Sequence, residues 1–172
     1  MQSMALSAFG LVILSLLSSP AQSSGGSPID GIPGAPALRV PVASAAVPRS
    51  DEQTLLDDVN RERLANGRPP LEFDQRLSAL ARAHAVDMAA RKYFSHQTPE
   101  GLSPFDRMDR AAYTYSYAGE NMALDENAVS ADRALWNSPE HRGNTLEPHY
   151  ARIGIATVRT TGGELFVEDF SD

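Results

Sequence analysis

Four residues in the second half of the chain have side chains suited to acid–base chemistry or to metal binding. His96 lies in a polar loop, Glu120 lies in a strand pattern, and Glu140 and His141 begin a later helix. Imidazoles and carboxylates are the usual general acids and bases, and two histidines with one glutamate form a known catalytic zinc set. Neither His-Glu-x-x-His nor an EF-hand loop is present, so these residues can meet only through the fold.

Serine chemistry is a less favoured interpretation of the same region. Ser95 precedes His96 and Ser138 lies close to His141, but no Gly-x-Ser-x-Gly elbow is present and nothing in the sequence activates either hydroxyl. The chain has no cysteine, which excludes a thiol nucleophile, disulfides and zinc knuckles. Of the remaining histidines, His84 is expected in the core and His149 on the surface.

Glu120 lies among apolar residues in a strand expected from Ala118 to Leu124. Period-two alternation puts it on one face with Ala118, Met122 and Leu124. Burying a carboxylate costs several kcal/mol unless it is paired or bound, which makes Glu120 a site candidate. The alternative is that Glu120 faces solvent or accepts backbone N–H bonds.

His141 is expected in the first turn of a helix that has Ser138 as its N-cap and Pro139 at its first position. The helix dipole disfavours an imidazolium at that end, so a neutral ring is expected, the form that binds metal or accepts a proton. A capping-turn role is the alternative for His141. For His96, a loop-bracing hydrogen bond and a site role are equally open.

Apolar periodicity and turn residues predict the elements that position these side chains. Further helices are expected from about Ser50 to Asn66-Gly67, from Asp74 to Lys92, from Phe105 to Ala111, and after an Asp125 cap, with Ala128, Ala131, Leu135 and Trp136. The first two helices have buried stripes made of Leu55, Leu56, Val59 and Leu64, and of Leu77, Leu80, Ala81, His84, Ala85 and Met88.

The last part of the chain predicts an antiparallel hairpin. Its strands are Tyr150 to Thr160 and Glu164 to Phe170, joined by Thr161-Gly162-Gly163. Because helices come first and a hairpin comes last, the expected class is α+β or a layered αβα sandwich.

Composition divides the 172 residues into three parts. Residues 1–23 carry no charged side chain and are expected to be a signal peptide, with a membrane anchor as the alternative. Residues 24–50 are rich in Pro, Gly, Ser and Ala and are expected to be a linker, and 51–172 form the folded domain. The protein is therefore expected to be extracellular or periplasmic, with no stable membrane span once the signal is removed. The oligomeric state stays open.

The net charge of -7 excludes the basic surface that a general nucleic-acid binder needs, so no nucleic-acid partner is expected. It also gives no electrostatic attraction to anionic lipid. A hydrophobic content of 42% is ordinary for a soluble globular domain, which argues against a disordered chain.

Four motifs in order resemble those of the CAP superfamily, which includes cysteine-rich secretory proteins, antigen five and pathogenesis-related proteins. They are Tyr93-Phe94-Ser95-His96, Ala118-Gly119-Glu120-Asn121, Trp136-Asn137-Ser138-Pro139-Glu140-His141-Arg142-x-Asn144 and Ile153-Gly154-Ile155-Ala156. The resemblance covers essentially all of 51–172 and is closest to the bacterial, secreted, cysteine-free branch.

The resemblance implies a three-layer αβα sandwich with a central antiparallel sheet and a cleft that carries two histidines and two acidic residues. By motif, His96, Glu120 and His141 match three of the four. The fourth position falls on Pro139, with Glu140 next to it but out of register. Some members bind zinc or another divalent ion through the histidines, so His96 and His141, with Glu120, are the expected metal ligands.

Two functions follow as expectations. The leading one is a secreted protein whose cleft, formed by His96, Glu120, Glu140 and His141, binds a small molecule, a lipid, a cell-wall component or a peptide, with or without the metal. The competing one is a metal-dependent extracellular hydrolase or protease, with Glu140 or Glu120 as the candidate catalytic carboxylate. A binding module is favoured because a fold does not fix an activity.

Overall fold

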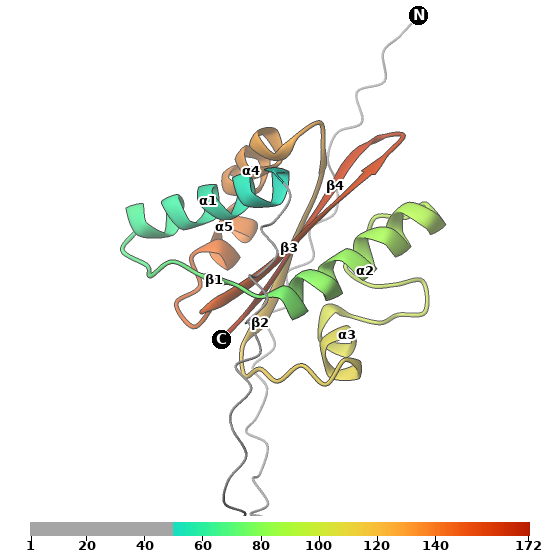
Figure 1. Ribbon diagram of the computed structural model, residues 1–172, viewed down its shortest axis with the longest axis horizontal. Coiled ribbons are helices and arrows are strands. Elements are labelled where there is room, and N and C mark those ends of the chain that lie inside the picture. The colour runs from blue at the N-terminus through green and yellow to red at the C-terminus, as the bar shows by residue number, and fades with distance from the viewer. Residues whose placement is uncertain (1–49) are drawn as a thin grey trace, which may run out of the picture.

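A computed structural model describes residues 50–172 (Figure 1). The expected signal peptide at 1–23 and nearly all of the expected linker at 24–50 lie outside the described residues. None of the helices in the described part is long and apolar enough to cross a membrane. The described elements, in chain order, are α1 (Ser50–Ala65), β1 (Glu72–Phe73), α2 (Gln75–Arg91), α3 (Pro104–Arg110), β2 (Ala118–Asp125), α4 (Ala128–Asn137), α5 (Pro139–Thr145), β3 (Arg152–Thr160) and β4 (Gly163–Ser171).

The elements form three layers. A four-stranded sheet with the order β1-β3-β4-β2 lies between α1, α4 and α5 on one side and α2 and α3 on the other (Figure 1). This arrangement confirms the predicted α+β class and its layered form. Because successive side chains of a strand face opposite layers, the side chains of β2 reach both sides of the sheet.

The sheet is mixed rather than wholly antiparallel. β4 pairs antiparallel with both β2 and β3, and the β3–β4 hairpin turns at Thr161 and Gly162 as predicted. The two-residue strand β1 pairs parallel with β3, which corrects the expectation of an antiparallel sheet. The reason is local: after α1, the chain passes along the outer edge of β3 before it turns into α2.

Each face of the sheet has its own apolar core. Leu55 and Val59 of α1 and Leu135 of α4 pack with Phe166 and Phe170 of the sheet on one face. On the other face, α2 packs on alternate positions of the same strands, and the contacting residues are Ala81, Ala85, Met88, Met122, Ala156, Leu165 and Val167. Because both faces are covered, β2 is buried from Ala118 through Ala123, and Glu120 with it.

Three side-chain expectations were wrong in detail. Leu64 is 61% exposed and Leu124 is 41% exposed, so neither extends its predicted buried face. The N-cap of α4 is Asn127, whose side chain accepts from the Ser130 backbone N–H, while Asp125 ends β2. Each of these positions lies at the end of an element. The apolar repeat stops there, so it predicts burial and capping less well than in the middle of the element.

Arg63 occupies the buried position at the end of α1 and is fully buried. Its guanidinium donates to four backbone carbonyls, at 2.8 Å to Pro69, 2.7 Å to Thr145, 3.1 Å to Glu147 and 3.1 Å to Tyr150. One side chain therefore joins the loop after α1 to the segment between α5 and β3.

Candidate functional site

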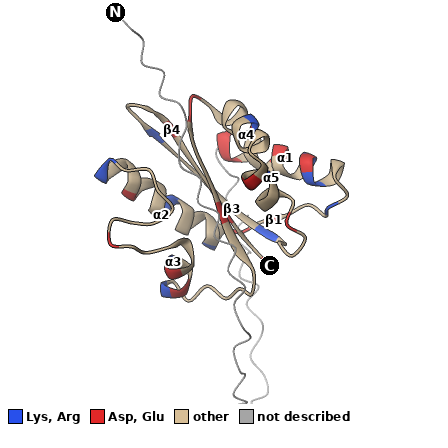
Figure 2. Cartoon of the chain, turned by 180° about the vertical axis from the view of Figure 1, so that it is seen from behind, with Lys and Arg blue, Asp and Glu red and all other residues tan. Residues whose placement is uncertain are grey.

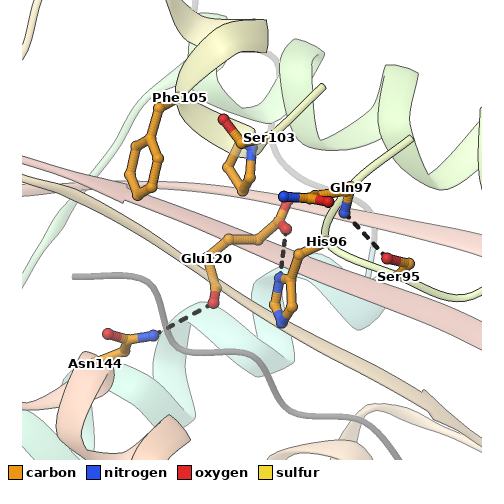
Figure 3. Close-up of a pocket in the computed structure, with 8 residues that line it drawn as sticks. Ser95, His96, Gln97, Ser103, Phe105, Glu120 and Asn144 are labelled. Atoms are coloured by element: carbon orange, nitrogen blue, oxygen red, sulfur yellow. Dashed lines mark hydrogen bonds and ion pairs between the residues drawn. The ribbon is translucent and has the colours of Figure 1, made fainter. Parts of the chain in front are cut away.

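A cavity of about 150 Å³ lies where the loop after α2, the start of α3 and strand β2 meet. Its lining mixes polar groups with one aromatic ring (Figure 3) and comprises Ser95, His96, Gln97, Ser103, Pro104, Phe105, Glu120 and Asn144. Two of the four predicted site residues, His96 and Glu120, thus line the same cavity.

His96 and Glu120 are in direct contact. The Nδ1 of His96 lies 2.7 Å from the Oε1 of Glu120, although the residues are 24 positions apart in the chain. Arg107 of α3 holds both partners, because it donates to the second carboxylate oxygen of Glu120 and, at 2.7 Å, to the carbonyl of His96. Both oxygens of Glu120 are therefore engaged, and His96 is fixed at its ring and at its backbone.

The ring of His96 is neutral near physiological pH. Burial and, to a smaller extent, the guanidinium of Arg107 lower its pKa from 6.5 to about 4. Because the carboxylate of Glu120 favours a proton on Nδ1, the Nε2 of His96 is left as a hydrogen-bond acceptor. Figure 3 shows this second ring nitrogen pointing away from Glu120.

A second buried acid lies beside Glu120. Asp169 of β4 is its cross-strand partner and is 1% exposed. Burial and the neighbouring carboxylate of Glu120 raise the pKa of Asp169 well above its ordinary value, while burial raises the pKa of Glu120 to about 7 against the opposing effect of Arg107. We therefore assign the charge of the pair to Glu120, which contacts Arg107, and treat Asp169 as the neutral acid.

His141 lies near this group but does not line the cavity. Burial and, to a smaller extent, the imidazole of His96 lower its pKa to about 4, so the ring of His141 lies in the electrostatic field of His96. The Nδ1 of His141 is buried without a hydrogen-bond partner among the described residues. The neutral ring expected from its place at a helix start agrees with this environment.

Glu140 does not line the cavity. Its side chain is exposed and accepts from the Ser138 hydroxyl at 3.0 Å, and this contact, with backbone hydrogen bonding, lowers its pKa. A general base needs a carboxylate aimed at the reacting water. Glu140 lies outside the cavity lining, so the geometry gives no support to the general-base role.

The residues present do not fit a three-ligand metal site. Within residues 50–172, no group of three or more His, Cys, Asp or Glu side chains is arranged to hold a metal ion. Each oxygen of Glu120 already has a protein partner, His96 on one and Arg107 on the other. Its contact with Nδ1 is instead that of a residue that orients an imidazole.

The other two histidines and Trp136 have structural roles. His84 is buried in α2, and its Nε2 lies 2.9 Å from the carbonyl of Ser95, next to the cavity. His149 is a surface residue, as predicted, and stacks on Tyr117 with ring centroids 4.0 Å apart. Trp136 is half-buried, with the guanidinium of Arg142 over its ring.

Sequence reasoning missed Arg107, Asp169 and Phe105. A weak signal exists for α3, because Ser103-Pro104 is a typical helix start and the structure has a full capping box between Ser103 and Asp106. That start fixes the helix that carries Phe105 and Arg107, but the sequence does not show which strand the helix meets.

Acidic residues also occur on the other side of the sheet, where α1 and α4 carry several of them (Figure 2). Burial, with smaller contributions from Asp132 and Glu62, raises the pKa of Glu168 of β4 to about 8 against the opposing hydrogen bond from Asn121. Burial and the nearby Asp132 likewise raise the pKa of Glu62 to about 7, and burial with Asp58 raises that of Asp132 to about 6. Arg61, which is paired with Asp58, is the nearby cation.

We expect this cluster to make the protein less stable in alkali. Folded-state pKa values above the ordinary 4.5 and 3.8 mean that the folded state binds protons more tightly, so the stability is present at low pH and is lost as pH rises through 6 to 8. His84, His96 and His141, with pKa values lowered to about 4, act oppositely below pH 6.5. Thermal melts should therefore peak near pH 6 and fall by at least ~5 °C by pH 9.

The matched variants are Glu168→Gln, which should flatten the alkaline fall, and Glu72→Gln on exposed β1, which should leave it unchanged. A melting temperature that stays constant between pH 6 and 9, or an identical fall in Glu168→Gln, would contradict the assignment.

Comparisons with known proteins identify the family and the fold. The family model described as "Cysteine-rich secretory protein family" (CAP) matches residues 56–170. The uncharacterized protein YkwD of Bacillus subtilis is 37% identical over 120 residues, which is 69% of this chain and 46% of that protein. The chain thus spans less than half the length of this relative.

Two solved structures share the fold. A Bacillus anthracis extracellular protein containing an SCP domain gives a TM-score of 0.65 at 29% identity, covering 70% of this chain and 40% of that one. An outer surface protein from Borrelia burgdorferi gives a TM-score of 0.68 at 22% identity, covering 72% of this chain and 93% of that one. At that identity the second likeness concerns the fold alone.

Proposed function

Because the chain belongs to the cysteine-rich secretory protein (CAP) family, we propose that it is exported and that the cavity beside His96 and Glu120 binds the polar part of an extracellular ligand. The observation that carries the proposal is the fixed, neutral imidazole of His96. Glu120 and Arg107 hold it so that Nε2 accepts a hydrogen bond from whatever enters the cavity.

The cavity favours a small, neutral group that donates hydrogen bonds. Its one charged lining residue, Glu120, is paired with Arg107, and the cavity holds about 150 Å³. Phe105 adds an apolar wall, and Gln97 and Asn144 add amides. Hydroxyl and N–H groups of a cell-wall sugar or peptide fit this lining better than a lipid chain, which needs a long apolar groove.

Export is supported by what the similar proteins are. The Bacillus anthracis structure, at 29% identity, is of an extracellular protein. The uncharged stretch at 1–23 is the matching feature of this sequence.

The hydrolase alternative is not favoured. It needs Glu120 as a metal ligand and Glu140 as a general base, but Glu120 is engaged by two partners and Glu140 is exposed and bonded to Ser138. We therefore assign no catalytic step to these residues.

We expect the full chain to bind a soluble muropeptide, an amino-sugar disaccharide with its peptide stem, in calorimetric titration. His96→Ala should weaken that binding at least about tenfold, because the acceptor in the cavity is lost. His141→Ala should weaken it less, because His141 does not line the cavity, and should melt close to wild type. His96→Ala should also melt somewhat lower, because it removes the partner of the buried Oε1 of Glu120. His149→Ala, which removes a surface imidazole, is the matched control.

Equal affinity in wild type and His96→Ala would rule out this cavity as the binding site. Binding of phosphatidylglycerol vesicles without binding of the muropeptide would contradict the ligand class. Repeating the titration with EDTA and with added zinc separates direct binding from metal-bridged binding, since only the second changes between the two solutions.

A further inference from the structure

One buried amide joins the sheet to the helix that carries His141. Asn121 of β2 is fully buried and points to the side of the sheet opposite Glu120. Its Nδ2 donates to the carbonyl of His141 at 3.2 Å and to the Oε2 of Glu168 at 3.1 Å. Its Oδ1 accepts from the Nδ2 of Asn144 at 3.0 Å.

Helix α5 depends on these contacts because it has few of its own. It is seven residues long, and its N-cap Ser138 makes no side-chain capping bond. Asn144 reaches back to β2 through Asn121 and, at 3.3 Å, through the carbonyl of Glu120. The Thr145 hydroxyl is the second donor to the carbonyl of His141, at 3.1 Å.

Glu168 fixes which way the amide of Asn121 points. Both N–H groups face oxygen acceptors, one on Glu168 and one on His141, so a reversed amide would set its own oxygen against two others. Glu168 is 1% exposed, and its Oε1 has no hydrogen-bond partner among the described residues. The groups that face it are Glu62 of α1, Asp132 of α4 and Asn121 itself.

We propose that Asn121 is a positioning residue for the proposed pocket, and that with Glu168 it fastens α5 to the sheet and so sets the places of His141 and Asn144. The link runs from the acidic side of the sheet to the cavity side, because Asn144 both contacts Asn121 and lines the cavity. The inference rests on the proposed function only in taking that cavity as the ligand site.

The decisive variant is Asn121→Asp, which keeps the shape of the side chain and replaces both donors by an anion facing two oxygens. Glu168→Gln keeps an acceptor for Asn121, so alone it should leave α5 in place. In the double variant, the amide introduced by Glu168→Gln can donate one hydrogen bond to the carboxylate introduced by Asn121→Asp. The pair is therefore a double-mutant cycle with a predicted rescue.

The measurement is hydrogen exchange of the α5 backbone, residues 139–145, together with the ring resonances of His141 by NMR, on the full chain. Asn121→Asp should speed α5 exchange about tenfold relative to amides of the β3–β4 hairpin and shift the His141 signals. Glu168→Gln should match wild type, and the double variant should recover part of the protection. Ile155→Val, a core change in β3, should leave the ratio of α5 to hairpin exchange unaltered.

If Asn121→Asp does not fold, Asn144→Ala serves instead, since it removes only the Asn144 contacts and should speed α5 exchange about threefold. Unchanged α5 exchange in the folded variants, or a double variant no better than Asn121→Asp, would overturn the proposal. No ligand enters these measurements, so their failure and the failure of muropeptide binding are separate results.

Discussion

Replacing Arg63 by methionine is expected to lower the free energy of unfolding by about 3–5 kcal/mol, the largest loss we predict for a single side chain. The guanidinium is fully buried and donates to four backbone carbonyls in two separate stretches of chain. Methionine fills much of the volume but leaves those carbonyls without donors, and each unsatisfied buried group costs about 1–3 kcal/mol before water or local movement relieves it.

Urea denaturation of the full chain measures this loss. Arg63→Lys separates charge from geometry: it keeps a cation but lacks the planar fork, so it should recover only part of the stability. Arg61→Met, two positions away and paired with Asp58 at the surface, is the control and should cost less than about 1 kcal/mol. Similar losses for Arg61→Met and Arg63→Met would mean that the buried contacts do not matter.

Gly154→Ala is expected to be the second large change, near the upper end of the about 1–3 kcal/mol that overpacking costs. A Cβ at Gly154 would lie 2.2 Å from the carbonyl carbon of Leu77 and 2.2 Å from the backbone N of Ser78. Both are backbone atoms of α2, so the helix itself must move away from β3. The same helix is bound there by the Ser78 hydroxyl, which donates to the carbonyl of Ile155 at 2.6 Å.

The matched control is Gly143→Ala, in the middle of α5. No atom lies within 4 Å of a Cβ at Gly143, and alanine favours a helix over glycine by about 1 kcal/mol, so this variant should melt at or above the wild-type temperature. If the two alanine variants melt alike, the contact of α2 with β3 is looser than the structure has it.

Much of the fold follows from local patterns. The stripe from Leu77 to Met88 identifies α2, and Thr161-Gly162-Gly163 identifies the hairpin, because each signal repeats within a few residues. The short parallel strand β1 has no such signal. Its pairing with β3 joins segments about eighty positions apart, and two residues are too few for an alternation.

The site was predictable in part for a similar reason. A carboxylate at an inward position of a strand must find a partner, which singled out Glu120, and the motif resemblance added His96. The partner that completes the arrangement, Arg107, carries no local mark: arginines are mostly exposed, and nothing in the sequence distinguishes it from Arg110 one turn later. The burial of Arg63 was not predicted for the same reason, and the adjacent Leu64 was expected at the buried position instead.

The position of β4 in the sheet has a consequence for how the protein folds. β4 is the last strand in sequence, yet it lies between β2 and β3, which do not pair with each other in the described sheet. Until residues 163–171 are in place, β2 has no strand to pair with and Glu120 has no Asp169 opposite it. Pairs such as Gly119 with Phe170 close long loops, a topology that folds slowly. A chain with this order cannot complete its sheet until its last strand has been made.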